Sequence, residues 1–193
     1  TTTPWTLPGN VGLAVGPDVT YVKVRVSEAA ANWNGAGGAD VGETMILAKD
    51  LMKEVLRHNV EIVEEFPGSQ LVGRSYEPLF PDAVPRGDSD TAWTVLSADW
   101  VTTTDGTGVV HTAVMYGEDD YNLGMEVGLP AFHTVGMDGS FVNGIHPELD
   151  GRYVKDCDEI IIALLSSPNG SNNTGPDSGL LYREKAYLHD YPH

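Results

Sequence analysis

TTTPWTLPGNVGLAV, residues 1–15, joins a stiff, hydroxyl-bearing peptide to an apolar segment that is typical of a β-strand. Pro4 restricts Thr3 to extended backbone, so alternate hydroxyls of the threonine run face the same side. Pro4 and Pro8 also hold the residues between them in a fixed trace. Threonines alone favour a plain threonine-rich surface, whereas the prolines favour one wall of a polar cleft. The sequence leaves both interpretations open.

Further short strands follow this stretch along the chain. Turn residues such as those at 16–18 separate apolar or alternating segments, which is the pattern of half-buried strands. Strands are predicted at residues 11–15, 21–26, 60–66, 93–96, 108–111 and 180–188.

Three segments are predicted to be helical. Residues 43–58 and 154–166 carry apolar residues at helical spacing, and 117–127 has an acidic first turn that suits a helix amino terminus. Loops are predicted at 29–42 and 167–179, and a surface excursion at 76–90. Together these elements predict a single α+β domain over residues 1–193, with a β-barrel-like core of short strands and a few peripheral helices.

The charge balance narrows the class of partner. The chain has 28 acidic and 11 basic residues, a formal net charge of −17. That balance opposes a broad phosphate-binding surface and DNA binding, because nucleic-acid binders show clustered Lys and Arg. No apolar run approaches the ~20 residues that cross a bilayer, so no membrane partner is expected. Electrostatics alone favours a small-molecule enzyme or a protein-binding module.

Cysteine usage indicates the compartment. Cys157 is the single cysteine, which rules out an internal disulfide and fits a reducing, cytoplasmic environment. Because it falls on the apolar stripe of the predicted helix 154–166, it is expected in the core and not as a nucleophile.

A second polar group of residues lies in DGTGVVHTAVMYGEDDY, residues 105–121. It places His111 at a predicted strand end and Asp120 at a predicted helix start. An ionised Asp120 could hold an ammonium group, and His111 could hydrogen-bond to a ligand or limit the size of a pocket. From spacing alone, an exposed strand-end histidine and acids that complement a helix dipole are equally good interpretations.

The sequence contains no motif for several other kinds of site. The six histidines are scattered and no Cys-x₂-Cys or His-x₃-His pair exists, so no metal site is expected. Phosphate-loop, dinucleotide and serine-hydrolase motifs are absent as well. Composition and spacing by themselves therefore lead to an α+β domain with a polar cleft, and no further.

Four stretches, taken in chain order, resemble the editing domain of isoleucyl-tRNA synthetases. They are TTTPWTLPGN at the start, DGTGVVHTA with GEDDY, LDGRYVKDCDEIIIALL, and GLLYREKAYLHDYPH at the end. The resemblance covers residues 1–193. Thr3 stands where valyl and leucyl enzymes have an arginine, which favours the isoleucyl member.

The resemblance implies hydrolytic proofreading: hydrolysis of the ester in mischarged valyl-tRNA(Ile). A hydrophobic pocket distinguishes one methylene by only about 1–3 kcal/mol, a limit for which this enzyme family is itself the standard example. The expected partners are the 3′ terminal adenosine of the tRNA, the valine moiety and the rest of the synthetase. No cofactor is expected here, because ATP would serve an aminoacylation site whose motifs are absent. The ends of the chain are expected at the junctions of an inserted domain.

The resemblance also assigns roles to residues. Thr1, Thr2 and Thr3 are expected to orient the ester and the attacking water, with Asn10 at a further editing-site position. Asp120 is expected to hold the α-amino group and His111 to block the larger isoleucine side chain. The remaining expected substrate-binding residues are Trp5, Thr6 and Tyr116.

Two other interpretations stay open, and one departure from the family pattern stands out. A non-catalytic module of the same fold would capture an aminoacyl-adenosine ligand without turnover. A generic esterase would need a serine or cysteine nucleophile with a basic partner. The departure is at Val114, where the family commonly has proline, and it extends through Tyr116 in the connection between His111 and Asp120.

Overall fold

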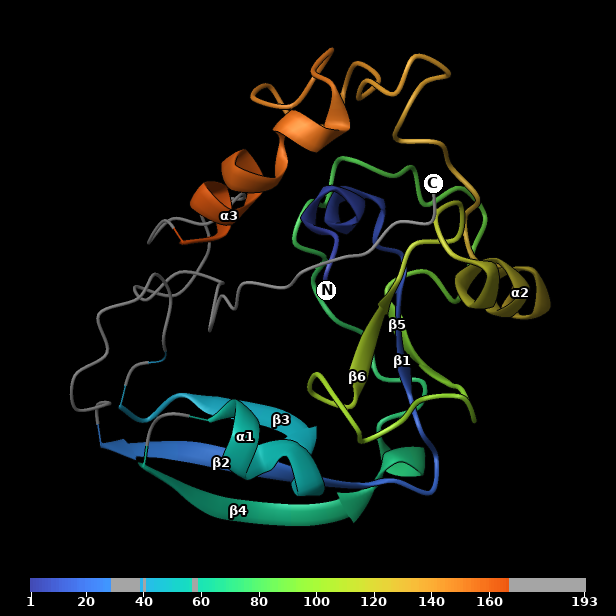
Figure 1. The fold of residues 1–193 in the computed structure, drawn as a ribbon. Helices are drawn as coiled ribbons and strands as arrows, with labels where there is room; N and C mark the ends of the chain where they lie inside the picture. Colours follow the sequence, from blue (N-terminus) through green and yellow to red (C-terminus); the bar gives the residue numbers. More distant parts are fainter. Residues whose placement is uncertain (29–38, 40, 57–58, 167–193) are drawn as a thin grey trace.

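The strands of the computed structural model, which describes residues 1–28, 39, 41–56 and 59–166, form two three-stranded sheets, one of which lies at one end of the molecule (Figure 1). One sheet has the strand order β5-β1-β6 and the other β3-β2-β4. The helices α2 (Glu118–Val127) and α3 (Asp158–Ser166) lie outside the sheets, so the α+β class is confirmed. Within the described residues the strands do not close into the expected barrel.

The β5-β1-β6 sheet is built around an apolar central strand. β1 (Gly12–Val15) pairs in parallel with β5 (Thr94–Ser97) and antiparallel with β6 (Val109–Thr112). Ala14 and Val15 are fully buried, as expected for the middle strand of a sheet. α2 packs beside this sheet, and the shared core includes Val11, Leu96, Val114, Leu123 and Leu129.

The central strand of the second sheet follows the alternation of a half-buried strand, whereas one of the edge strands is exposed along most of its length. β2 (Thr20–Glu28) lies between β3 (Thr44–Ala48) and β4 (Asn59–Pro67), antiparallel to both. Alternate residues of β2 are buried, namely Val22, Val24 and Val26. The short helices η2 (Lys49–Leu51) and α1 (Met52–Val55) follow β3, and Met52 and Val55 pack against the buried strand residues.

The predicted helix at 43–58 is wrong for its first part, because residues 44–48 form β3. Met45 and Leu47 lie two residues apart and pack with Val22 and Val24, whereas Ile46 between them is 38% exposed. The apolar residues of this segment satisfy a period of two as well as a helical one. Pairing with β2 decides in favour of the strand, a case in which tertiary contacts override local preference.

One tyrosine connects the two sheets. Tyr21 of β2 is fully buried, donates its hydroxyl hydrogen to the carbonyl of Gly108 before β6, and accepts a hydrogen bond from Gly16 N–H at 3.2 Å. Gly68, in η3 (Gly68–Gln70), fits against the same corner: a Cβ there would lie 2.1 Å from the Gly16 carbonyl oxygen. Only glycine allows this approach, so the chain must have glycine at the position where the sheets meet.

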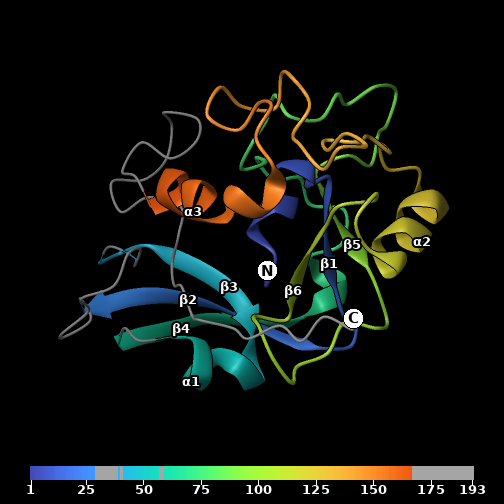
Figure 2. The ribbon, with the colours of Figure 1, turned by 45° about the horizontal axis from the view of Figure 1, so that its top comes forward.

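A third core region lies under α3 and the amino-terminal helix η1 (Pro4–Gly9) (Figure 2). Cys157, between η4 (Val154–Asp156) and α3, is fully buried, which confirms its predicted place in the core. The excursion at 76–90 contains no strand or helix, as predicted. Part of this segment lies in the core, however, because Phe80, Ala83 and Val84 are buried.

The remaining strand and helix predictions within the described residues are confirmed to within a few residues. The start of the third helix differs, since residues 154–156 form η4 before α3 begins. The predictions for 29–38 and 40 within the first loop, and for 167–179 and 180–188, lie outside the described residues. No described helix is both long enough and apolar enough to cross a bilayer.

Candidate functional site

The threonine peptide leads into a 3₁₀ helix of two turns, η1. Thr6 N–H donates to the Thr3 carbonyl at 3.0 Å, which closes the first turn of η1, and Pro4 at its start needs no hydrogen-bond partner. Thr3 N–H donates to Thr1 Oγ1 at 3.0 Å. Thr1 and Thr2 are exposed, and Thr3 is partly buried. The three threonines therefore lie directly before η1, and two of them are exposed to solvent.

Thr6 brings this peptide to the predicted histidine. Its Oγ1 lies 3.1 Å from His111 Nε2 and 2.8 Å from the Thr3 carbonyl oxygen. A carbonyl can only accept, so the hydroxyl hydrogen goes to Thr3, and His111 Nε2 must carry the hydrogen that Thr6 receives. The imidazole is therefore the Nε2–H tautomer, with a lone pair on Nδ1. That Nδ1 is buried and has no hydrogen-bond partner among the described residues.

Burial keeps His111 neutral. Desolvation by burial lowers its pKa from 6.5 to about 4. At neutral pH the ring is uncharged. It can present bulk to a ligand, but it does not offer a positive charge.

Asp120 lies in the first turn of α2 and is half-buried. Its Oδ1 accepts a hydrogen bond from Ala113 N–H at 2.8 Å, which connects the helix start to the end of β6. Burial raises the pKa of Asp120, while the bond from Ala113 works in the opposite direction. A partly desolvated carboxylate of this kind gains from a cation that pairs with it.

Asn10 is buried, and its side chain binds other parts of the protein. Nδ2 donates to the Gly12 carbonyl at 2.9 Å, and Oδ1 accepts from the hydroxyl of Tyr76. Its backbone carbonyl accepts from Trp93 Nε1 at 3.2 Å. The structure thus places Asn10 in the framework behind the threonine peptide.

Trp5 and Tyr116 pack against each other at the base of η1. Their ring centroids are 5.2 Å apart at an interplanar angle of 76°, an edge-to-face arrangement. The Tyr116 hydroxyl lies 2.8 Å from Thr134 Oγ1 and accepts from Val135 N–H at 3.0 Å. Trp5 N–H donates to Asp158 Oδ1 at 2.9 Å, and its indole Nε1 is buried with no partner among the described residues.

The structure brings together Thr3, Thr6 and His111, and it connects Asp120 to the end of the same strand. Asn10 and Tyr116 instead hold the surrounding peptide segments. Several contributing residues were not predicted: Tyr76, Trp93, Thr134 and Asp158. They meet the site from 18 to 153 positions away in sequence, so no local spacing could indicate them.

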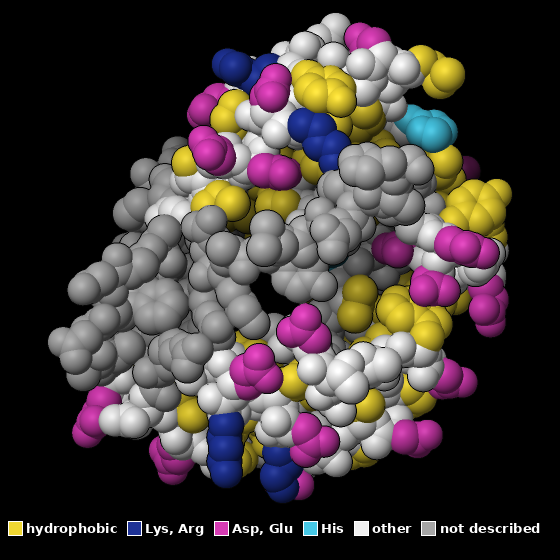
Figure 3. Space-filling model, in the orientation of Figure 1, with side chains coloured by type: hydrophobic (Ala, Val, Ile, Leu, Met, Phe, Trp, Pro, Cys, Tyr) yellow, Lys and Arg dark blue, Asp and Glu magenta, His cyan; other side chains and the backbone are white. Residues whose placement is uncertain are grey.

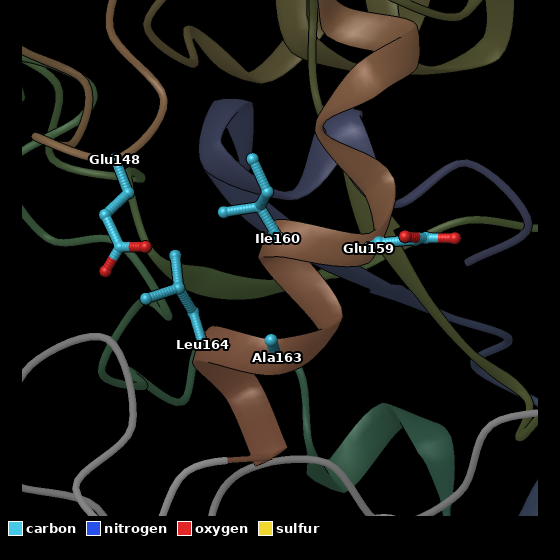
Figure 4. A pocket seen from close by; sticks show the side chains of 5 residues that line it. All are labelled: Glu148, Glu159, Ile160, Ala163 and Leu164. Atoms are coloured by element: carbon cyan, nitrogen blue, oxygen red, sulfur yellow. The ribbon is translucent and has the colours of Figure 1, made fainter.

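Two described cavities lie elsewhere. One of about 430 Å³ is lined by Glu148 and by residues of α3, namely Glu159, Ile160, Ala163 and Leu164 (Figure 4). A second, of about 420 Å³, lies between 80–82 and 144–150. Neither contains a predicted site residue, and the first offers carboxylates and apolar groups but no side-chain donor for an ester. Within the described ranges, no group of three or more metal-ligating side chains is found.

Comparison with known proteins gives relatives over the whole chain. No protein-family model matches it. An isoleucine–tRNA ligase of Clostridium novyi (strain NT) is 40% identical over 193 residues, covering 100% of this chain and 16% of the relative. One of Corynebacterium diphtheriae is 39% identical over 196 residues, covering 100% of this chain and 17% of the relative. The chain thus spans about a sixth of the length of the curated relatives it matches.

Solved structures share the fold at low sequence identity. The crystal structure of GlLeuRS-CP1 matches with a TM-score of 0.60 at 15% identity, covering 96% of this chain and 83% of that one. The editing domain of the cytosolic leucyl-tRNA synthetase of P. falciparum matches with a TM-score of 0.59 at 12% identity, covering 95% and 78%. At these identities the likeness establishes the fold alone.

Proposed function

This chain belongs to the isoleucyl-tRNA synthetase family, as the segment with the fold of the editing domains, and on that premise we propose that it hydrolyses mischarged valyl-tRNA(Ile) after transfer. The substrate is the valine ester on the 3′ terminal adenosine. The setting is the cytoplasm, with the rest of the synthetase as the covalent partner of the segment.

The observation that carries the proposal is the contact between Thr6 and His111. These residues are 105 positions apart, and their atoms lie 3.1 Å from each other. The contact joins the threonine peptide to the strand end that leads, through Ala113, to Asp120. An ester with a neighbouring ammonium group needs this combination: hydroxyl donors, a carboxylate and a size-limiting wall.

The chemistry is ester hydrolysis by water. The water oxygen attacks the ester carbonyl carbon, the bond from that carbon to the ribose oxygen breaks, and a proton passes to the ribose oxygen. Valine and a free tRNA 3′ end are the products. His111 is a weak base, because burial lowers its pKa to about 4. The rate therefore depends on positioning of the water and on hydrogen bonds to the developing oxyanion.

Selectivity against isoleucine is assigned to His111 as a steric limit. The ring is held on one side by Thr6 and is neutral, so it adds bulk without attracting the ammonium group away from Asp120. A site built to exclude a larger side chain complements a synthetic site that cannot reject a smaller one.

The acidic surface is consistent with a substrate that arrives end-first. Acidic side chains are spread over the face shown in Figure 3, with few Lys or Arg side chains among them. With a formal net charge of −17, the segment does not attract the tRNA body. We assign that grip to other parts of the synthetase, and only the terminal nucleotides to this segment.

A deacylation assay on the 193-residue chain tests the proposal. Val-tRNA(Ile) should be hydrolysed and Ile-tRNA(Ile) spared. Asp120→Asn should lower kcat/KM by about 10–100-fold, since a hydrogen bond to a charged group contributes about 1.5–3 kcal/mol. The asparagine keeps an oxygen to accept from Ala113 N–H, so the helix start is preserved while the charge is lost.

Asp119→Asn is the matched control, because Asp119 is an exposed neighbour in the same helical turn. It should hydrolyse the valyl ester like the parent chain. Equal rates on the two esters, or no rate above that of buffer, would contradict the proposal. Binding of a valyl-adenosine analogue without turnover would identify the chain as a non-catalytic capture module instead.

A further inference from the structure

Asn10, Tyr76 and Trp93 form a closed ring of hydrogen bonds. The Tyr76 hydroxyl donates to Asn10 Oδ1, and the Tyr76 backbone N–H donates to the Trp93 carbonyl at 3.0 Å. Trp93 Nε1–H completes the ring by donating to the Asn10 carbonyl at 3.2 Å. Burial raises the pKa of Tyr76, so its hydroxyl remains a donor. Since each residue binds both others, a shift of one breaks a hydrogen bond.

The ring is attached to the strand residues next to His111. Trp93 N–H donates to the Val11 carbonyl at 2.8 Å, and Val11 N–H donates to the Thr112 carbonyl at 2.9 Å. In the next row of the sheet, Gly12 pairs with both Thr94 and Thr112. Because Thr112 directly follows His111, these hydrogen bonds fix the position of Trp93 relative to the strand that contains His111.

Trp93 holds this place in a rarely adopted conformation. Its φ is 57°, in the left-handed region, and no other non-glycine residue of the described ranges has a positive φ. Its backbone N–H and its indole N–H bond to the successive carbonyls of Val11 and Asn10. The Arg86 guanidinium lies over the aromatic side chain of Trp93, 5.8 Å from its centroid. Such conformations persist where surrounding contacts determine them, and they cluster at functional sites.

We propose that Trp93 is a positioning residue of the site, acting through Asn10 and Tyr76. Asn10 ends η1, so the ring sets where that helix and its threonines lie relative to His111. The effect of this positioning on catalysis rests on the proposed function. Trp93 touches no reacting atom in this assignment, and it acts only by holding the wall that does.

Trp93→Phe tests the role because it keeps the aromatic ring and removes Nε1–H. For hydrolysis of Val-tRNA(Ile) by the 193-residue chain, kcat should fall about tenfold while KM stays within about twofold, since misplaced groups slow the reaction more than they weaken binding. Tyr76→Phe removes the hydrogen bond from the Tyr76 hydroxyl to Asn10 Oδ1 and should have the same effect. The double variant should lose less than the product of the two losses, because both break one ring.

Trp100→Phe is the matched control, since Trp100 is 38% exposed and lies outside the site. It should leave kcat unchanged. An equal loss in Trp100→Phe, full multiplicativity of the double variant, or unchanged kcat in both ring variants would overturn the proposal. If Trp93→Phe does not fold, as judged by thermal unfolding, Tyr76→Phe carries the test with Trp93 intact.

A second readout separates this inference from the proposed function. In NMR spectra, both ring variants should shift the Asn10 side-chain amide and the His111 ring resonances, and Trp100→Phe should not. These shifts do not require that the chain be a deacylase. A parent chain without hydrolysis would refute the proposed function, whereas His111 resonances that do not respond would refute the positioning role.

Discussion

His111 and Asp120 show how burial sets the chemistry of single residues. Desolvation lowers the pKa of the histidine and raises that of the aspartate, so each shift favours the neutral form. Thr6 accepts the one hydrogen of the neutral histidine ring. The aspartate receives Ala113 N–H on one oxygen, and in the proposed function it pairs with an ammonium group.

The His111 shift predicts how stability depends on pH. The folded-state pKa is about 4 and the unfolded value 6.5, so the unfolded chain binds more protons between these values. Stability is therefore full above pH 6.5 and is lost as pH falls toward 4. From pH 7 to 5 this group should remove about 2 kcal/mol from the free energy of unfolding.

Urea unfolding at the two pH values measures this loss. In His111→Gln the decrease should be smaller by that amount, because no imidazole is left to protonate. His133→Gln, which removes an exposed imidazole, is the matched control and should keep the decrease of the parent chain. The same decrease in His111→Gln as in the parent would refute the assignment.

At the scale of elements, the departure from the family pattern lies in the connection from β6 to α2. Val114 is buried and packs with Leu123 of α2, so its side chain takes part in the core. Tyr116 binds Thr134 and Val135 through its hydroxyl and packs on Trp5 through its ring. The altered segment therefore holds α2, η1 and the 134–135 segment together.

Tyr116→Phe should destabilise the protein by about 1–3 kcal/mol. It removes a hydroxyl from Val135 N–H and from the fully buried Thr134, and leaving buried polar groups unpaired costs about that much. The midpoint of urea unfolding measures the change. Tyr121→Phe, on the 47% exposed Tyr121 of α2, is the control and should change stability by less than about 0.5 kcal/mol. Equal effects of the two variants would contradict the structural role of Tyr116.

At the scale of the whole molecule, the proposed function assigns recognition of the tRNA end to this segment and recognition of the tRNA body to other parts of the synthetase. A formal net charge of −17 repels a polyanion, and the repulsion is long-ranged only at low salt. The segment is therefore suited to receive a short terminus that another part of the synthetase delivers.

Binding of whole tRNA to the 193-residue chain should be weak and should not decrease with salt. Between about 50 and 200 mM salt, the affinity should stay constant or rise, because screening reduces the repulsion. A protein with 6–10 phosphate contacts would lose about 10³–10⁵ in affinity over that range. Titration of labelled tRNA measures the slope, and a short aminoacylated CCA oligonucleotide is the comparison. A steep loss with whole tRNA would contradict the assignment.

Much of the fold could be predicted from local pattern. The strands at 12–15, 20–28 and 59–67 and the helix at 118–127 follow from alternation, turn residues and an acidic helix start. The segment 44–48 could not, because its apolar residues fit two periods and only pairing with β2 distinguishes them. Pairing between distant strands also decides whether they form two open sheets or a barrel, so local pattern could not distinguish these two arrangements.

By itself, the sequence determined the resemblance to a family and most of the element pattern, since these depend on residue identity and short spacing, and the resemblance in turn indicated which hydroxyls, imidazole and carboxylate to expect in the candidate site. Only the tertiary structure decided what each of them contacts. It placed Thr6 on His111, turned Asn10 and Tyr116 toward the framework, and brought Trp93 into a left-handed conformation beside them. The physical reason is that protonation state, tautomer and hydrogen-bond partner depend on contacts between residues tens of positions apart, and local sequence does not encode these contacts one by one.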